Sequence, residues 1–317
     1  MNPPPRRILV VRRDNIGDLL CTTPLLAALR RTWPDAWIGV LANRYNAPIL
    51  AGNPDIDAFF AYEKAKHRAA GKGRLAVWRE TAALLWRLRR MKLGLVLCAS
   101  PGARRFARLL TPRQIVEADR AGPGHEVEVT FRLLSALGLS AVPGPLVLTS
   151  PTRPQSDGRC LAVHISARKP RQRWPTERHA ELIRRVFAAG LAARVLLFWA
   201  PGAETDPQHP GDDDKAARLI DDLADLPVTP VPTHTLEELV AGLSLADTVI
   251  CSDGGAMHIA AALGKPVVCF FGNSSAKRWH PWGVAYELLQ KPSQDVIDIG
   301  VDEALEALQR LMVRTGR

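Results

Sequence analysis

Short apolar runs alternate with helix-patterned segments along the chain, and this alternation restricts the fold more than any other feature. In the first half, apolar runs at 8–11, 37–41 and 93–98 flank helical patterns at 19–31 and 74–92. Short, uninterrupted apolar runs are typical of strands that are buried on both faces. Strands that alternate with helices form a parallel sheet with helices on both sides. The sequence therefore predicts the α/β class.

A second series of the same kind follows a stretch rich in proline, glycine and serine at 140–158. That composition is typical of a linker. The chain has 317 residues, about twice the commonest domain size. We therefore expect two domains, residues 1–150 and 151–317, with the last helix packing back toward the first domain. In the second series the expected strands are 161–165, 195–199, 248–251 and 266–271, and the expected helices are 177–189, 214–224, 236–245, 256–263 and 301–313.

The two halves differ in charge. Residues 1–150 contain 23 Lys and Arg against 11 Asp and Glu, a balance of +12, while residues 151–317 contain 19 against 21, a balance of −2. Within 64–113 there are 14 basic residues and one acid, Glu80. This asymmetry favours a polyanionic partner, which can be a nucleic acid, an anionic membrane surface or a phosphorylated substrate. A solvated, arginine-rich face is the alternative.

A nucleic acid is the weakest of these partners. Single strands are bound on aromatic side chains that lie among basic residues. Only Trp78, Trp86 and Phe106 are available in the basic stretch 64–113, and two of them fit a helix core. We therefore expect no nucleic-acid partner.

Neither the cysteines nor the acidic residues indicate a disulfide framework or a metal site. The cysteines are far apart without a CxxC pair, so they are expected to be buried in a reducing compartment. The acidic loop at 204–214 matches no standard metal spacing. The start of the chain lacks a signal peptide, and no apolar run could span a membrane. We expect a cytoplasmic protein with no metal and no cofactor. The cysteines are Cys21, Cys98, Cys160, Cys251 and Cys269.

The segment from Arg12 to Asp18 joins the first predicted strand to the first predicted helix. Gly17 permits a tight turn. Asp18 then lies near a helix N-terminus, where the dipole keeps a carboxylate ionised and able to accept a proton from a sugar hydroxyl. Alternatively, Asp18 is only an N-cap, a position that aspartate favours. The GxGxxG fingerprint is absent, which argues against a nicotinamide oxidoreductase.

The segment from Ser252 to His258 is a glycine-rich turn between the strand at 248–251 and the helix at 256–263. Free N–H groups and the positive end of a helix dipole bind phosphate oxygens. A departing diphosphate needs such donors for its growing charge. The alternative is a plain turn, with Asp253 as a cap and His258 packed in the core.

Two neighbouring loops carry further polar residues. Four cations lie in 168–173, between the strand at 161–165 and a Pro-bounded helix, and this arrangement suits a diphosphate. A solvated loop is the competing interpretation. Asn273 lies in the loop after the strand at 266–271, where a small polar side chain could contact phosphate or sugar.

Taken together, these segments resemble the glycosyltransferase family 9 heptosyltransferases, which build the inner core of lipopolysaccharide. The resemblance covers nearly the whole chain and is strongest at 8–57 and 252–283. It implies a GT-B architecture, in which two Rossmann-like, doubly wound parallel-sheet domains face each other across a cleft. It also implies inverting transfer from ADP-heptose without a metal, with the nucleotide sugar on the C-terminal domain and the acceptor on the N-terminal domain.

By the same resemblance, Asp18 is the catalytic base that deprotonates the acceptor hydroxyl. The implied donor-binding residues are Asp253, Gly254, Gly255, Ala256, Met257, His258, Lys169, Arg173, Thr22, Thr23 and Asn273. The implied acceptor-binding residues are Arg13, Asn15, Gly17, Arg104 and Arg105.

One position departs from the family pattern. Family members commonly carry a phosphate-contacting lysine two residues before the Trp-Pro step, and this chain has Gln172 there. Lys169, Arg171 or Arg173 could supply the missing charge. The pair Gly254-Gly255 also replaces a commoner Ser/Thr-Gly.

The sequence therefore predicts a glycosyltransferase that moves heptose from ADP-heptose to a lipopolysaccharide inner-core acceptor. The basic half is expected to meet the anionic, lipid-linked acceptor and the cytoplasmic leaflet of the inner membrane, where the protein would be peripheral. The alternative is an enzyme of the same fold that uses another nucleotide sugar, or a protein or small-molecule acceptor.

Overall fold

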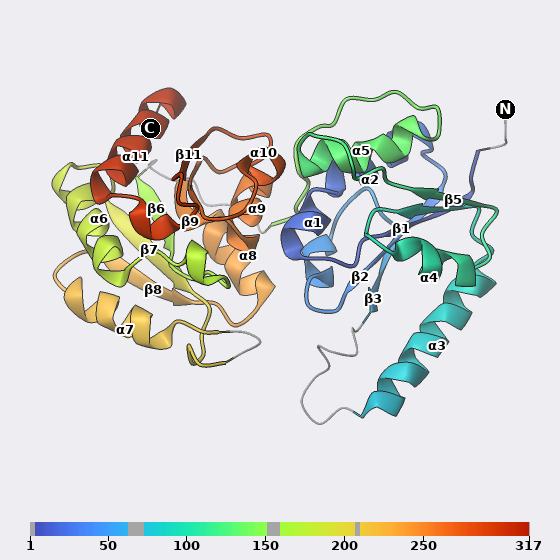
Figure 1. The fold of residues 1–317 in the computed structure, drawn as a ribbon, viewed down its shortest axis with the longest axis horizontal. Coiled ribbons are helices and arrows are strands. Elements are labelled where there is room, and N and C mark those ends of the chain that lie inside the picture. The colour runs from blue at the N-terminus through green and yellow to red at the C-terminus, as the bar shows by residue number, and fades with distance from the viewer. Residues whose placement is uncertain (1–3, 63–72, 151–158, 207–209, 317) are drawn as a thin grey trace. The chain divides into compact units, whose positions relative to one another are not determined.

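The computed structural model describes residues 4–62, 73–150, 159–206 and 210–316. The chain divides into two compact units, Met1–Thr149 and Ser150–Arg317 (Figure 1). The division falls inside the proline-rich stretch at 140–158, of which residues 151–158 lie outside the described part.

The first unit is built on a five-stranded parallel sheet of order β3-β2-β1-β4-β5. Its central strand β1 is buried on both faces, because the apolar run leaves no side chain that needs water. The strands are β1 (Arg7–Val11), β2 (Trp37–Asn43), β3 (Ala58–Tyr62), β4 (Leu95–Cys98) and β5 (Gln114–Glu117).

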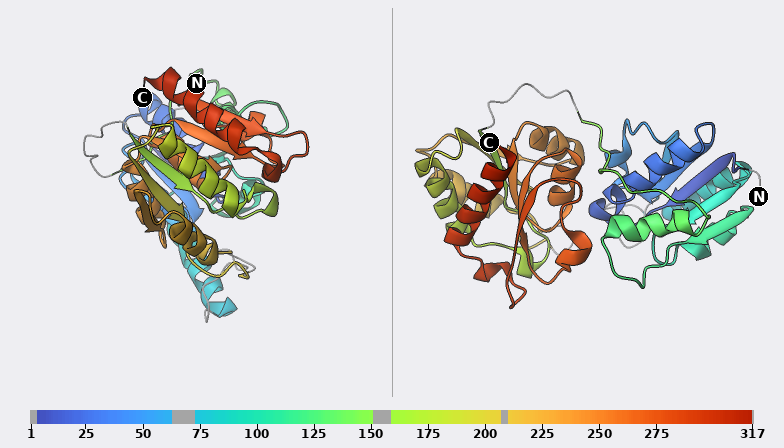
Figure 2. Two further views of the ribbon diagram at one scale, coloured as in Figure 1. Left: turned by 90° about the vertical axis from the view of Figure 1, so that its left-hand side faces the viewer. Right: turned by 90° about the horizontal axis from the view of Figure 1, so that it is seen from above.

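Helices cover both faces of this sheet (Figure 2). One face packs against α3 and α4, whose side chains share a core with β1 and β4. The other two long helices of the unit, α2 and α5, pack against each other. The helices are α1 (Ile16–Leu20), α2 (Thr23–Thr32), α3 (Arg74–Arg90), α4 (Ala103–Leu109) and α5 (Glu126–Ser135), with a 3₁₀ turn at Ala47–Leu50.

The second unit has a six-stranded parallel sheet of order β11-β10-β9-β6-β7-β8. The strands are β6 (Cys160–His164), β7 (Arg194–Trp199), β8 (Val228–Pro232), β9 (Thr248–Ser252), β10 (Val267–Phe271) and β11 (Tyr286–Gln290). The helices are α6 (Thr176–Ala188), α7 (Asp213–Asp222), α8 (Leu236–Ser244), α9 (Gly255–Ala262), α10 (Ala276–Trp279) and α11 (Val301–Thr315), with 3₁₀ turns at Pro170–Gln172 and Val296–Asp298.

Each sheet reverses its strand order beside its first strand. In the first unit the chain adds β2 and β3 on one side of β1 and then returns to place β4 on the other side. In the second unit β7 and β8 extend one side of β6, and β9 begins the other. The loops that leave β1 and β4, and those that leave β6 and β9, therefore diverge at a topological switch point. In open parallel sheets this is where ligands bind.

One expectation about the helices needs correction. The helical pattern at 19–31 is two helices rather than one, because α2 begins at Thr23 with Pro24 in its first turn, where proline is tolerated but cannot continue a preceding helix. The buried side chains of the last helix, α11, join the core of the second unit, where α11 packs against α6 and β11.

Candidate active site

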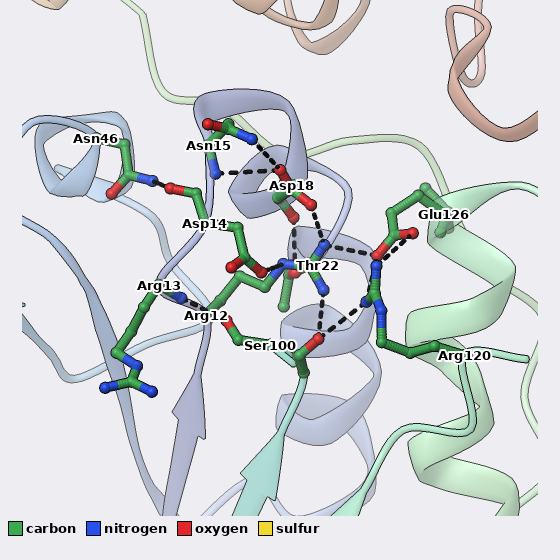
Figure 3. Close-up of polar contacts among 12 residues, drawn as sticks. Arg12, Arg13, Asp14, Asn15, Asp18, Thr22, Asn46, Ser100, Arg120 and Glu126 are labelled. Atoms are coloured by element: carbon green, nitrogen blue, oxygen red, sulfur yellow. Dashed lines mark hydrogen bonds and ion pairs between the residues drawn. The ribbon is translucent and has the colours of Figure 1, made fainter. Parts of the chain in front are cut away.

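The side chain of Arg12 is the centre of a buried charged cluster at the switch point of the first unit (Figure 3). Arg12 follows β1 directly and is 0% exposed. Its Nη2 donates to Asp18 Oδ1 and to Glu126 Oε1, each at 2.6 Å. Its Nη1 donates to the carbonyl of Ala99, just beyond β4, at 2.6 Å. Arg12 thus joins the loop after β1 to the loop after β4 and to the start of α5.

Asp18 lies in the first turn of α1 and is 7% exposed. Its Oδ2 accepts hydrogen bonds from the backbone N–H and the side-chain amide of Asn15, each at 3.1 Å. Asn15, rather than Asp18, is the N-cap residue, so the capping alternative describes only part of what Asp18 does. A carboxylate has about four acceptor positions. The three hydrogen bonds from Arg12 and Asn15 leave one acceptor position on Oδ1 for a further hydrogen bond.

Glu126 is the second carboxylate to which Arg12 Nη2 donates. It is fully buried and also accepts from Arg120, at 2.8 Å from Nη1 and 3.1 Å from Nη2. Burial alone would raise the pKa of Glu126, but Arg12 and Arg120 hold that pKa below its ordinary value. Burial likewise opposes the charge of Arg12, while Asp18 and Glu126 raise the Arg12 pKa above its usual value. Arg12 and Glu126 therefore form a charged pair.

The loop that carries Asp14 and Asn15 is held from both neighbouring strands. At the end of β2 and just beyond it, Asn43 Nδ2, Tyr45 Oη and Asn46 Nδ2 donate to the carbonyl of Asp14 at 2.8, 2.9 and 3.1 Å. After β4, the hydroxyl of Ser100 accepts from the backbone N–H of Arg13 at 2.6 Å. Asp14 itself lies 3.5 Å from Arg12 Nε, and burial raises the pKa of this carboxyl.

The residues predicted to bind the acceptor lie in different surroundings. The guanidinium of Arg13 points away from Asp18 (Figure 3) and stacks on the rings of Tyr62 and Phe106, at 5.3 and 5.2 Å. Asn15 is exposed beside Asp18, and Gly17 is buried within α1. Arg104 and Arg105 are exposed on α4, which follows β4.

Thr22 and Thr23, which the family resemblance implies for the donor phosphates, are fully buried in this structure. The hydroxyl of Thr22 donates to the carbonyl of Asp18 at 2.9 Å, and that of Thr23 to the carbonyl of Leu20 at 2.7 Å. Thr23 Oγ1 also accepts from the backbone N–H of Val147 at 2.8 Å. Their side chains therefore support the α1–α2 junction in this structure.

At the switch point of the second unit, Gln172 ties three loops together. Its Nε2 donates to Asp253 Oδ2 at 2.7 Å and to Ser274 Oγ at 3.1 Å. The three residues follow β6, β9 and β10 respectively. Gln290 adds a second tie, with its Nε2 donating to the carbonyls of Gly272 and Ser274 at 2.7 and 2.9 Å. Burial raises the pKa of Asp253, and Ser274, Lys169 and Gln172 oppose that rise.

The glycine-rich turn presents backbone rather than side chains. Ala256, Met257 and His258 are buried in α9, and the His258 ring packs edge-on against Trp279 at 6.0 Å. A Cβ on Gly254 would have no neighbour closer than 4.0 Å, so an open space adjoins the first N–H groups of α9. The chemistry available here is therefore anion binding by backbone donors.

In the basic loop at 168–173, Arg173 already has partners within the second unit, whereas Lys169 is exposed. Arg173 donates through Nε to the carbonyl of Ala167 at 2.9 Å and pairs with Glu204 at 2.5 Å. Lys169 is exposed, and its charge lowers the pKa of Asp253, which belongs to the glycine-rich turn. Asn273 is exposed after β10. Lys169 is thus better placed than Arg173 to replace the charge that Gln172 lacks.

His164 and His179 flank this loop in sequence, and among these two and Lys215 only His179 is buried, while the others are half-buried. Lys215 Nζ donates to the carbonyls of Ile165 and Trp174, at 3.1 and 2.9 Å, and burial lowers its pKa to about 8. Burial lowers the pKa of His164 to about 4 and that of His179 well below its usual value. Both histidines are therefore neutral at pH 7.

Across the described ranges, no group of three or more His, Cys, Asp or Glu side chains is arranged to hold a metal ion. The five cysteines are buried and unbridged. In the same part of the chain, no helix has the length and apolar character that crossing a bilayer requires.

Sequence comparison decides the family. Residues 147–306, just over half of the chain, match the model of glycosyltransferase family 9 (heptosyltransferase). The chain belongs to glycosyltransferase family 9. It is 26% identical to lipopolysaccharide heptosyltransferase 3 of Escherichia coli, over 84% of this chain and 83% of the relative. It is 23% identical to lipopolysaccharide heptosyltransferase 2 of Salmonella typhimurium, over 98% of this chain and 99% of the relative.

Solved structures of this family share the fold. A family 9 glycosyltransferase from Veillonella parvula superimposes with a TM-score of 0.79 at 18% identity, covering 98% of this chain and 97% of that one. The E. coli heptosyltransferase WaaC with ADP gives a TM-score of 0.77 at 20% identity, covering 96% and 99%. This family 9 glycosyltransferase therefore has the GT-B fold class, with two Rossmann-like parallel-sheet domains.

Sequence reasoning singled out Asp18 and the turn at 252–258 as candidates and noted Gln172 only as a departure from the family pattern, but it missed the contacts that hold these segments. Arg12 and Glu126 are 114 positions apart, and Gln172 and Asp253 are 81 apart. One signal was available for Arg12, since a charged residue that directly follows a buried strand at a switch point requires a buried partner.

Proposed function

We propose that this enzyme transfers heptose from ADP-heptose to a lipopolysaccharide inner-core acceptor, with Asp18 as the general base. The observation that carries the proposal is the state of Asp18. It is a nearly buried carboxylate at a topological switch point, paired with Arg12, with one acceptor position left on Oδ1. The family membership and the names of the relatives support heptose as the sugar.

The proposed reaction is one inverting displacement. The acceptor hydroxyl oxygen bonds to the anomeric carbon as the bond from that carbon to the diphosphate oxygen breaks, and the hydroxyl proton passes to Asp18 Oδ1. The proton transfer is favourable, because the hydroxyl becomes strongly acidic as its oxygen bonds to carbon. Proton transfer of this kind contributes about 10²- to 10⁴-fold to a rate.

The second domain would bind the donor. The first N–H groups of α9 and the exposed Lys169 are suited to the diphosphate, whose charge grows as it departs. The exposed Arg104 and Arg105 suit an anionic acceptor. The reaction is proposed to need no metal, so chelators should leave the rate unchanged.

Substitution of Asp18 tests the proposal. Asp18→Asn should lower the turnover of ADP-heptose by at least about 100-fold and leave the dissociation constant for ADP unchanged, since the donor site is in the other domain. Turnover would be followed by ADP release and by mass analysis of the product. Asp14→Asn is the matched control, because it removes the same charge from the same cluster. Normal turnover in Asp18→Asn, or an equal loss in both variants, would refute the base assignment.

The donor and the acceptor need a separate test. Thermal shift with ADP-heptose, ADP, UDP and UDP-sugars should show the largest stabilisation with the two adenine nucleotides. A larger shift with a UDP-sugar would favour the alternative, an enzyme of the same fold with another donor. If the enzyme transfers the sugar to a protein or a small molecule and not to a truncated lipopolysaccharide, the proposed acceptor is wrong.

A further inference from the structure

The helix α3 has two apolar faces, only one of which is covered. Its inner face packs on the core of the first unit through Val77 and Leu88, with Leu84 and Leu85 partly buried beside them. These positions recur at helical spacing, as expected of a helix that lies on a sheet. The helix extends beyond the sheet of its unit (Figure 1).

The outer face of α3 carries an apolar stripe that is exposed. Leu75, Trp78 and Trp86 are 75%, 70% and 62% exposed. With Ala82, these residues are three, four and four positions apart, so they form one line along the helix. Single exposed apolar residues are common on protein surfaces, but a continuous line with two tryptophans marks an interaction site.

The charges beside this stripe have one sign. Arg79, Arg89 and Arg90 are exposed on the outer side of the helix. The guanidinium of Arg90 lies over the ring of Trp86, 4.6 Å from its centre. The one acid between Leu75 and Arg90 is Glu80, which lies toward the inner side and pairs with Arg44 at 3.5 Å. The stripe itself is therefore purely apolar and basic.

We infer that the outer face of α3 docks on an anionic phospholipid bilayer. Tryptophan rings favour the boundary between headgroups and acyl chains, and arginine side chains reach from that depth to phosphates. A helix with these two features lies in the plane of the interface. A second copy of the chain would bring arginines against arginines. A single-stranded nucleic acid would find the two rings about 12 Å apart along the helix axis, too far to stack adjacent bases.

The inference deepens the proposed peripheral membrane contact, because it names the surface that makes it. A lipid-linked acceptor is presented at a bilayer, so docking through α3 would raise its local concentration near the first domain. Membrane binding does not require catalysis, and its test is therefore independent of the reaction.

The experiment uses the full chain and vesicles of phosphatidylcholine, with and without phosphatidylglycerol, in a sedimentation assay. The wild type should bind the anionic vesicles at least tenfold more tightly than the neutral ones, and this preference should weaken with salt. Trp78→Gln with Trp86→Gln should weaken binding to anionic vesicles at least tenfold. Intrinsic fluorescence should shift to the blue on binding in the wild type and much less in this variant.

A matched pair of charge variants completes the test. Arg79→Gln with Arg89→Gln should weaken binding severalfold, while Arg194→Gln with Arg218→Gln, which removes two exposed charges from the other unit, should not. The tryptophan variant should retain wild-type kcat on a water-soluble acceptor and lose rate only on acceptor embedded in vesicles.

Equal binding of the wild type to both kinds of vesicle, or unchanged binding in the tryptophan variant, would overturn the inference. Preferential binding of an oligonucleotide that the vesicles fail to displace would also overturn it. Vesicle binding without heptose transfer would instead refute the proposed function and leave the docking surface standing.

Discussion

Arg12 joins two carboxylates that lie far apart in the sequence, Asp18 and Glu126, through one buried guanidinium group. It has no exposed surface, and it donates to Asp18, Glu126 and the Ala99 carbonyl. Removal of one partner from a buried ion pair is costly because the other charge stays buried without compensation.

Arg12→Met should therefore lower the free energy of unfolding by about 3–5 kcal/mol. Glu126 would keep its hydrogen bonds with Arg120, whereas Asp18 would keep only those from Asn15. Urea unfolding followed by circular dichroism measures the loss. Arg194→Gln, at an exposed position, is the control and should change stability by less than about 0.5 kcal/mol. A loss below about 1 kcal/mol for Arg12→Met would show that the cluster is not a stabilising unit.

Gln172 offers a second residue-scale prediction. Gln172→Leu removes the donor that Asp253 and Ser274 share, so the loops after β6, β9 and β10 lose one tie. We expect stability to fall by about 1–3 kcal/mol and ADP binding to weaken about tenfold, measured by calorimetry. Gln172→Lys should bind ADP at least as well as the wild type, because its ammonium can pair with Asp253. Equal binding by all three proteins would mean that Gln172 does not organise the donor site.

At the scale of elements, the inner strands were predictable and the edge strands were not. All seven strands expected from the sequence are inner strands of the two sheets, while β3, β5, β8 and β11 were missed and are the four edges. Inner strands read as uninterrupted apolar runs because both faces are covered. An edge strand such as β8 has Pro230 and Pro232 and no buried position, so its sequence resembles a loop.

The site was predictable to a similar degree. The motifs at 12–18 and 252–258 are local in sequence, so their position between a strand and a helix could be inferred. Their supports, Glu126 and Gln172, come from distant segments that only the folded sheet brings close. Spacing along the chain carries no information about such pairs.

The loop after β10 gives the element-scale prediction. A Cβ on Gly272 would lie 2.2 Å from the carbonyl oxygen of Arg171, so the loop passes against the turn at Pro170–Gln172. Gly272→Ala should push these segments apart and raise the dissociation constant for ADP at least fivefold. Gly264→Ala is a useful contrast, since it has open space but a φ of 70°, and it should cost stability without loss of ADP affinity. Unchanged ADP binding in Gly272→Ala would contradict the role given to this contact.

At the scale of the whole molecule, histidines that desolvation keeps neutral set an acid limit on stability. In the unfolded chain an imidazole gains its proton near pH 6.5, whereas folded His164 does so only at about 4. Between these pH values the folded state binds fewer protons than the unfolded state, so the free energy of unfolding falls as the pH falls. Above pH 7 the histidines are neutral in both states and add no pH dependence.

The free energy of unfolding should therefore decrease between pH 6.5 and pH 4.5, with up to about 1.4 kcal/mol per pH unit from each such histidine. His179→Phe keeps the edge contact with Trp174, at 4.8 Å between ring centres, and removes one of these groups. Calorimetric unfolding at a series of pH values should give a shallower acid slope for this variant than for the wild type. Parallel slopes would show that His179 gains its proton in the folded state as readily as in the unfolded one.

The position of β1 at the middle of its sheet also affects how the protein can be synthesised. Ile8 pairs with Ile38 on one side and with Leu95 on the other, so β1 leaves the ribosome before both of its neighbours and has both flanks paired only after β4 has emerged. The sheet is complete once Glu117 has emerged, well before β6 is translated. The N-terminal domain can therefore finish folding during translation, while the C-terminal sheet must wait for Gln290. Ribosomes stalled near codon 190 should thus carry a nascent chain whose first domain already resists proteolysis.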